Sequence, residues 1–262
     1  MAESPRTVAI SAACEAGGIL RDMIGRIRHV RYKGVVDLVT EADELSERHI
    51  MNRLRESFPD YQILAEESGK TTPSEGESTS RWIVDPLDGT VNYAHGYPIF
   101  AVSIALEVSG VIELGVVYVP PLDELFVAER GAGATLNGEP IHVSTTDSLI
   151  QSMVTTGFPY DLEERGQNIV HWGNFIHATQ AVRRDGSAAM DLCYVAAGRF
   201  DGFWERWLNP WDVAAGGLMV TEAGGLLTDF QGQPFSVYRR ECLASNGLIH
   251  DQMIEVLRRG GG

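Results

Sequence analysis

The sequence has few cysteines and no long apolar run. Its three cysteines, Cys14, Cys193 and Cys242, lie far apart and form no C-x-x-C pair, which argues against a zinc ribbon or a redox motif and fits a reducing compartment. No apolar stretch reaches the length of a membrane span, and the polar N-terminus lacks a signal-peptide core. We therefore expect a soluble, cytoplasmic protein without a membrane partner.

Positive charge is scarce as well. The chain has 21 Lys and Arg residues against 36 Asp and Glu residues, a formal net charge of −15. Because a polyanion would be repelled at long range, we expect no nucleic-acid or anionic-membrane partner. The 262 residues, 44% of them hydrophobic, suffice for one large domain or two closely packed ones.

The apolar pattern predicts a mixed α/β (α+β) chain. Helical spacing predicts helices over residues 5–28, 40–58, 166–179, 187–197, 209–223 and 248–259. Strands are predicted over residues 62–65, 81–84, 99–108, 111–119, 124–128, 141–143, 152–156, 226–229 and 242–244, with turns at Ser109-Gly110 and Asn137-Gly138. Residues 69–80 predict a polar surface loop. A soft boundary near Val143 separates an α+β half (1–143) from an α/β half (144–262), packed as one unit.

Four acidic residues stand at strand ends and helix starts, where rigid scaffolds place functional groups. Glu66 follows one predicted strand, Asp85 follows the next, Asp88 lies three residues on, and Asp212 opens a distant helix. In the turn of residues 85–90, proline and glycine allow both acids to point to one side, with the Leu87 carbonyl between them. Carboxylates and carbonyls are the ligands that Mg²⁺ and Ca²⁺ prefer.

Each motif also has a purely structural explanation. D-P-x-D-G is a good turn sequence with no chemistry attached. Asn209, Pro210 and Asp212 make a good helix N-terminus for capping reasons alone. Asp43, three residues after Thr40, would likewise complete a capping box.

Five segments together resemble the inositol monophosphatase family. They are residues 37–43 (DLVTEAD), 65–68 (AEES), 82–93 (WIVDPLDGTVNY), 186–189 (GSAA) and 211–216 (WDVAAG), in the family's order. Found together, the D-P-x-D-G-T-x-N-aromatic and W-D-x-A-x-G signatures are highly specific. The resemblance implies a layered α-β-α-β-α sandwich, usually a homodimer, that hydrolyses a small phosphomonoester with Mg²⁺ and is inhibited by Li⁺.

The resemblance also implies a set of metal ligands. Glu66, Asp85 and the Leu87 carbonyl would hold one Mg²⁺, and Asp85, Asp88 and Asp212 would hold a second. Asp43 matches a family position near a weaker third metal, so two or three Mg²⁺ ions are expected in each site.

Further roles in catalysis and substrate binding follow from the same resemblance. Thr90 would orient the attacking water together with Glu66, beside the metal ligand Asp85. The phosphate would lie against the backbone of Gly89 and Thr90. The remaining substrate-binding residues are expected to be Asp88 and Asp212 near the metals, and Glu205, Gly186, Ser187 and Ala188 around the polyol.

The resemblance leaves some points open. The role of Lys33, four residues before the D-L-V-T segment, is undecided, and the pair Arg183-Arg184 is interpreted as a dimer or core ion-pair element in preference to a phosphate clamp. Of the family's substrates, myo-inositol monophosphate is favoured, because no strongly basic cluster near Glu205 would take a second phosphate. Fructose 1,6-bisphosphate, histidinol phosphate, 3′-phosphoadenosine 5′-phosphate, or a regulatory partner-binding role beside catalysis are the alternatives.

Overall fold

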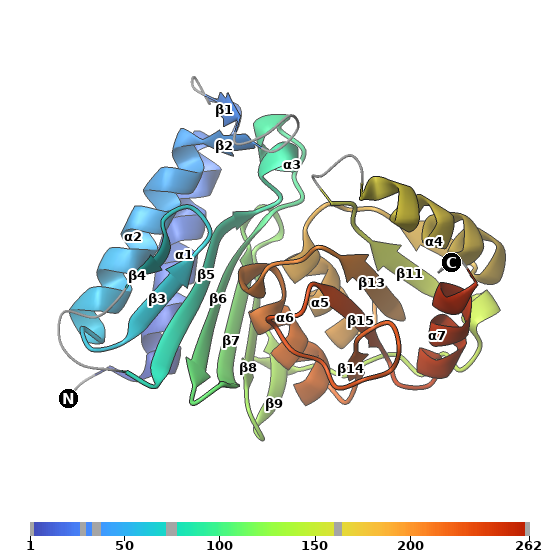
Figure 1. Ribbon diagram of the computed structural model, residues 1–262. Coiled ribbons are helices and arrows are strands. Elements are labelled where there is room, and N and C mark those ends of the chain that lie inside the picture. The colour runs from blue at the N-terminus through green and yellow to red at the C-terminus, as the bar shows by residue number, and fades with distance from the viewer. Residues whose placement is uncertain (1–2, 27–29, 33–37, 72–77, 160–163, 260–262) are drawn as a thin grey trace.

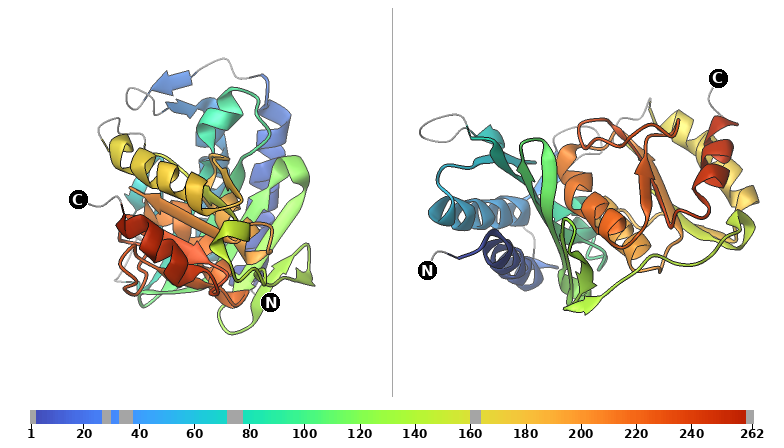
Figure 2. Two further views of the ribbon diagram at one scale, coloured as in Figure 1. Left: turned by 90° about the vertical axis from the view of Figure 1, so that its right-hand side faces the viewer. Right: turned by 90° about the horizontal axis from the view of Figure 1, so that it is seen from below.

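The computed structural model describes residues 3–26, 30–32, 38–71, 78–159 and 164–259. In this part of the chain, two main β-sheets and seven α-helices stack in five layers, α-β-α-β-α (Figure 1). The right-hand view of Figure 2 shows the two sheets nearly edge on, with helices outside and between them. The predicted fold class is confirmed.

The N-terminal half forms the first two layers. Helices α1 (Pro5–Met23) and α2 (Glu41–Ser57) pack on one face of an eight-stranded sheet with the order β10-β9-β8-β7-β6-β5-β3-β4. A short helix, α3 (Thr90–Ala94), follows β5, and β1 (Val30–Tyr32) pairs with β2 (Leu38–Thr40). The strands of the large sheet are β3 (Gln62–Ala65), β4 (Gly69–Thr71), β5 (Ser80–Asp88), β6 (Ala101–Val108), β7 (Val111–Val119), β8 (Glu124–Glu129), β9 (Gly133–Leu136) and β10 (Glu139–Pro140).

The C-terminal half supplies the other three layers. Helices α5 (Ala188–Ala196) and α6 (Pro210–Glu222) lie between the sheets, and α4 (Arg165–Ala178) and α7 (His250–Arg258) cover the outer face of the second sheet. That sheet has the order β12-β11-β13-β15-β14. Its strands are β11 (Met153–Thr156), β12 (Ala181–Arg183), β13 (Gly202–Arg206), β14 (Leu226–Thr228) and β15 (Glu241–Ser245).

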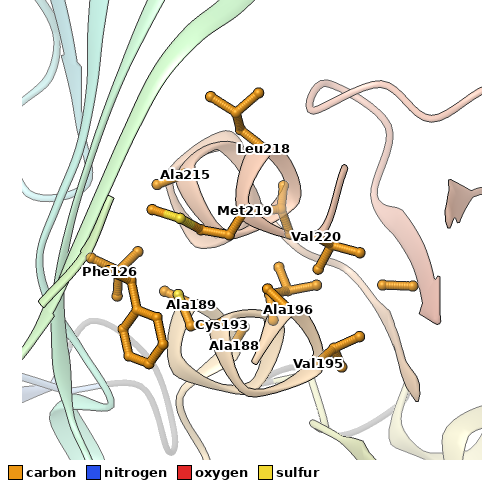
Figure 3. Close-up of a cluster of buried hydrophobic side chains, with 14 of the residues drawn as sticks. Phe126, Ala188, Ala189, Cys193, Val195, Ala196, Ala215, Leu218, Met219 and Val220 are labelled. Carbon is orange, nitrogen blue, oxygen red and sulfur yellow. The ribbon is translucent and has the colours of Figure 1, made fainter. Parts of the chain in front are cut away.

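Small side chains let the two central helices approach closely. Figure 3 shows the alanines of α5 facing Ala215 and Met219 of α6, beside Phe126 of the first sheet. A β-carbon on Gly216 would lie 2.7 Å from the β-carbon of Leu192, so residue 216 cannot be larger without moving a helix. This tight central layer fixes where the N-termini of α5 and α6 stand relative to each other.

Most predicted elements are present, and several were misplaced or missed. The strand predicted at residues 141–143 is wrong, because the pairing with β9 ends at Pro140. Residues 69–71 form β4 instead of a loop, while residues 72–77 and 27–29 lie outside the described residues. Strands β1, β2, β9, β12 and β13 and helix α3 were not predicted. The boundary near Val143 stays a prediction. Among the described helices, none has the length and apolarity to cross a membrane.

Candidate active site

The predicted site residues come together around one cavity of about 270 Å³. It is bordered by the end of β5, the start of α3, the N-termini of α5 and α6, and the end of β13. Apart from Asp43, the site residues expected from the sequence all line this cavity: Glu66, Asp85, Leu87, Asp88, Gly89, Thr90, Gly186, Ser187, Ala188, Glu205 and Asp212. The cavity also has lining residues that sequence reasoning did not place there: Gly157, Phe158, Pro159, Arg184, Asp191, Arg206, Trp207, Leu208, Asn209 and Trp211.

The acidic turn is an irregular end of β5. Pairing with β6 shifts register between Asp85 and Asp88, so the strand bends where the two acids stand. The Leu87 amide donates to Asp85 Oδ1 at 3.0 Å, and the Ser46 hydroxyl donates to the Pro86 carbonyl at 2.7 Å. Gly89 follows with φ 95°, and a β-carbon there would lie 2.9 Å from the Ile99 carbonyl oxygen. Only glycine fits that position.

Asp43 lies outside the cavity lining and supports Thr90 from behind. The Thr90 hydroxyl contacts Asp43 Oδ1 and the Leu87 carbonyl oxygen, each at 3.0 Å. The other Asp43 oxygen accepts hydrogen bonds from the Thr40 amide at 2.9 Å and the Thr40 hydroxyl at 2.5 Å. The capping-box explanation of Asp43 is therefore confirmed. The contact with Thr90 was not predicted, because 47 residues separate the two in sequence.

Asp88 joins the two halves of the site. Its Oδ2 accepts hydrogen bonds from the Ser187 hydroxyl and the Ala189 amide, both at 2.7 Å, so the start of α5 is tied to the end of β5. Burial raises the pKa of Asp88 to about 6, while the hydrogen bonds from Ser187 and Ala189 pull it down.

The acids that line the cavity around this turn repel one another. Burial, and then the charges of Glu66, Asp88 and Asp212, raise the pKa of Asp85 well above its usual range. Burial, and then Asp88 and Glu66, do the same for Asp212. Asp212 also accepts a hydrogen bond from the Asn209 amide at 2.6 Å and caps α6. The capping explanation for Asp212 is correct, and it coexists with a place in the acidic cluster.

The oxygen ligands of these carboxylates are of the type that a hard cation prefers. The side chains are, however, not yet close enough together to form a metal site. Among the described residues, no three acidic, histidine or cysteine side chains already stand as close as in a formed metal site. Their all-oxygen character and mutual repulsion are nevertheless what a divalent cation relieves. Binding would require the side chains to close on the ion.

Glu205 forms the opposite wall of the cavity, on the buried strand β13. Burial raises its pKa to about 8, with Arg184 lowering it and Asp88 raising it further. Glu205 is not a surface acid, and the two arginines nearest to it in sequence have other partners. Arg206 pairs with Glu241 at 2.9 Å and Arg199 with Glu124 at 2.6 Å.

Arg184 is exposed and lines the cavity next to Gly186. The core ion-pair interpretation of Arg184 is wrong, because its guanidinium reaches the cavity rim within 2.4 Å of where a Gly186 β-carbon would be. A part in a dimer contact stays a prediction. Lys33 lies outside the described residues.

The sequence signal for the missed residues was weak. Gly157, Phe158 and Pro159 follow β11, and Asp191 lies within α5, in segments without a motif. Asp191 is buried and accepts a hydrogen bond from the Thr155 hydroxyl at 3.0 Å. Burial, with Asp185 adding to it, raises the Asp191 pKa well above its usual range.

Comparisons with known proteins agree with this geometry. A model of the inositol monophosphatase family matches residues 1–261. The chain is 44% identical over 252 residues to the inositol-1-monophosphatase of Synechocystis sp., covering 95% of this chain and 87% of that protein. It is 41% identical over 248 residues to the fructose-1,6-bisphosphatase/inositol-1-monophosphatase of Thermotoga maritima, covering 93% and 91%.

A solved structure with the same fold is the extragenic suppressor protein suhB from Bartonella henselae. It matches with a TM-score of 0.93 and 43% identity, over 97% of this chain and 98% of that one. With a family match that spans almost the whole sequence and the predicted site residues gathered in one cavity, the chain belongs to the inositol monophosphatase family.

Proposed function

We propose that this chain is a Mg²⁺-dependent phosphatase that hydrolyses myo-inositol monophosphate to inositol and phosphate. One observation carries the proposal. Four mutually repelling acids, Glu66, Asp85, Asp88 and Asp212, border the same cavity as a carboxylic acid on the opposite wall, Glu205. The first group suits cations and phosphate, and Glu205 suits a polyol.

The acidic group fits two Mg²⁺ ions. Glu66, Asp85 and the Leu87 carbonyl would hold one, and Asp85, Asp88 and Asp212 the other. When bound, Mg²⁺ supplies positive charge for the phosphate and lowers the pKa of the attacking water. The third, weaker metal expected near Asp43 has less support, because Asp43 is occupied by Thr40 and Thr90.

Thr90 is suited to fix the direction of the attacking water. Its one hydroxyl proton has two acceptors at 3.0 Å, Asp43 and the Leu87 carbonyl, so its oxygen lone pairs are free to accept from the water. Glu66 is the neighbouring acid that would share this task. A fixed acceptor is what positions a water for in-line attack.

The phosphate would lie between the backbone of residues 89–90 and the start of α5. Gly89 keeps the backbone accessible because it has no side chain, and Arg184 adds a positive charge at the rim. Gly186, Ser187 and Ala188 would border the polyol, and Glu205 on the opposite wall would bond its hydroxyls.

A phosphate-release screen tests the proposal. Purified protein with Mg²⁺ should turn over inositol monophosphate faster than fructose 1,6-bisphosphate, histidinol phosphate or 3′-phosphoadenosine 5′-phosphate. Chelation should abolish turnover and added Mg²⁺ should restore it; full activity in excess chelator would exclude the metal-dependent mechanism. Inhibition by Li⁺ is expected from the family resemblance.

Fructose 1,6-bisphosphate is the second candidate substrate. Two arginines, Arg184 and Arg206, line the cavity and could meet a second phosphate, although Arg206 is already paired with Glu241. A higher kcat/KM for the bisphosphate than for inositol monophosphate would reverse our order. A homodimer in the cytoplasm is proposed from resemblance, and light scattering of the purified protein tests the dimer.

A further inference from the structure

Trp207 is strained and exposed at the same time. Its φ of 68° lies in the left-handed region, which bulky side chains rarely adopt and which glycine adopts freely. The residue is 40% exposed, so burial in a core does not explain why a tryptophan occupies the position. Such a residue needs another reason to be there.

The strained turn has a clear structural purpose that does not require an indole ring. It lies directly after β13 and redirects the chain from Glu205 on that strand to Asn209, where α6 begins. The Trp207 amide donates to the Arg240 carbonyl oxygen at 2.6 Å, which holds the turn. This is a backbone bond that glycine would form equally well.

Trp207 is one of the residues that line the cavity. Phe158, Leu208 and Trp211 line the cavity as well. In sequence, Trp207 follows Glu205 by two residues. The Arg240 guanidinium carbon lies over the indole ring, 5.6 Å from its centroid. This cation–π contact restricts the orientation of the ring. An aromatic side chain held in this way offers an apolar surface to whatever fills the cavity beside Glu205.

We infer that Trp207 is a specificity-determining residue that packs against the C–H face of a cyclic leaving group. The inference rests on the proposed function and adds a selection by shape. Glu205 would bond hydroxyls, which a linear and a cyclic polyol both carry. A flat apolar face exists only on the ring, and its burial against an indole favours cyclic over acyclic alcohols.

Two substrates separate this selection from the chemistry at phosphorus. Inositol 1-phosphate and glycerol 2-phosphate are both phosphate monoesters of secondary alcohols with neighbouring hydroxyls, and only the first has a ring. Trp207→Gly removes the indole and relieves the backbone. Trp207→Phe keeps an aromatic face. Ser109→Gly is the matched control, because Ser109 also has a positive φ, 52°, in a turn that does not line the cavity.

The expected result combines higher stability with weaker binding. Trp207→Gly and Ser109→Gly should each raise Tm, by about 2–4 °C. Trp207→Gly should raise KM for inositol 1-phosphate about tenfold and change KM for glycerol 2-phosphate less than about twofold. Trp207→Phe should restore most of the difference, and Ser109→Gly should leave both KM values unchanged.

Other results overturn the inference in distinguishable ways. Equal changes in KM for the two substrates, or a lower Tm for Trp207→Gly with KM unchanged, would make the ring a purely structural residue. If the parent protein hydrolysed glycerol 2-phosphate but not inositol 1-phosphate, the proposed substrate would be wrong and the inference with it. If the parent hydrolyses inositol 1-phosphate and Trp207→Gly does so with the same KM, only the inference fails.

Discussion

Gly157 leaves room for the carboxyl group of Glu205. A β-carbon on residue 157 would lie 2.1 Å from Glu205 Oε1 and 2.2 Å from Oε2. Because the obstacle is the end of a flexible side chain, Gly157→Ala should push the carboxyl group aside at little cost in stability. We expect Gly157→Ala to raise KM for inositol monophosphate while the protein stays folded, as measured by steady-state kinetics and thermal melting.

A second glycine supplies the control for this variant. A β-carbon on Gly173, in α4, meets no atom within 4 Å. Gly173→Ala should therefore leave KM unchanged and slightly raise Tm, because alanine favours a helix over glycine. An unchanged KM in both variants would show that the position of the Glu205 carboxyl does not matter for the substrate.

Glu205→Gln tests the same wall through chemistry. Under the proposed function, this nearly isosteric change should lower kcat/KM for inositol monophosphate by much more than for an aryl phosphate without hydroxyls. The ratio of the two kcat/KM values in variant and parent is the quantity to compare. A constant ratio would remove Glu205 from substrate binding.

The pH dependence of stability gives an independent measurement on Glu205. Burial raises its pKa from 4.5 to about 8, so the folded protein holds the proton more tightly than the unfolded chain. Stability therefore falls between about pH 4.5 and pH 8 and stays lower above that range. Without metal, Glu205→Gln should match the parent's Tm near pH 4.5 and exceed it by several degrees at pH 8.5. A constant difference between the two melting curves across this range would contradict the raised pKa.

The sequence predicted the acidic side of the site and, through the family resemblance, Glu205 on the opposite wall, but not the residues that surround Glu205 there. The D-P-x-D-G-T turn and the W-D-x-A-x-G helix start each place acids by local geometry, which a short sequence encodes. Gly157 and Trp207 join the cavity only because β11 and β13 pair in the second sheet. Strand β13 was not predicted, so neither residue had a sequence signal for its place in the site.

Asp88→Asn and Asp212→Asn test the metal ligands. The amide oxygen can still accept the bonds from Ser187 and Ala189 at position 88, or from Asn209 at position 212, so both variants should fold. Each loses an anionic ligand, and we expect kcat to fall more than about 100-fold.

Metal binding to these variants can be followed without turnover. Mg²⁺ should raise the Tm of the parent, because it binds only the folded chain, and the shift should shrink in both variants. Glu139→Gln, an exposed acid on β10 outside the cavity, should keep the full shift and the full kcat. Near-normal kcat in either active-site variant would contradict the two-metal assignment.

Asp43 has two structural roles, and a pair of variants separates them. One of its oxygens caps α2 through Thr40, and the other meets the Thr90 hydroxyl. Thr40→Ala breaks part of the cap alone and should lower stability by about 0.5–2 kcal/mol with kcat unchanged.

In Asp43→Asn, only one acceptor oxygen remains for the two tasks, so the cap or the Thr90 hydroxyl loses its partner. If Asp43 positions Thr90, Asp43→Asn should lower kcat strongly with little change in KM, and Thr90→Val should lower it by about 10²–10⁴-fold. Thr90→Ser, which keeps the hydroxyl, should retain much of the activity. Equal losses of Tm in Thr40→Ala and Asp43→Asn with normal kcat in both would leave Asp43 as a helix cap only.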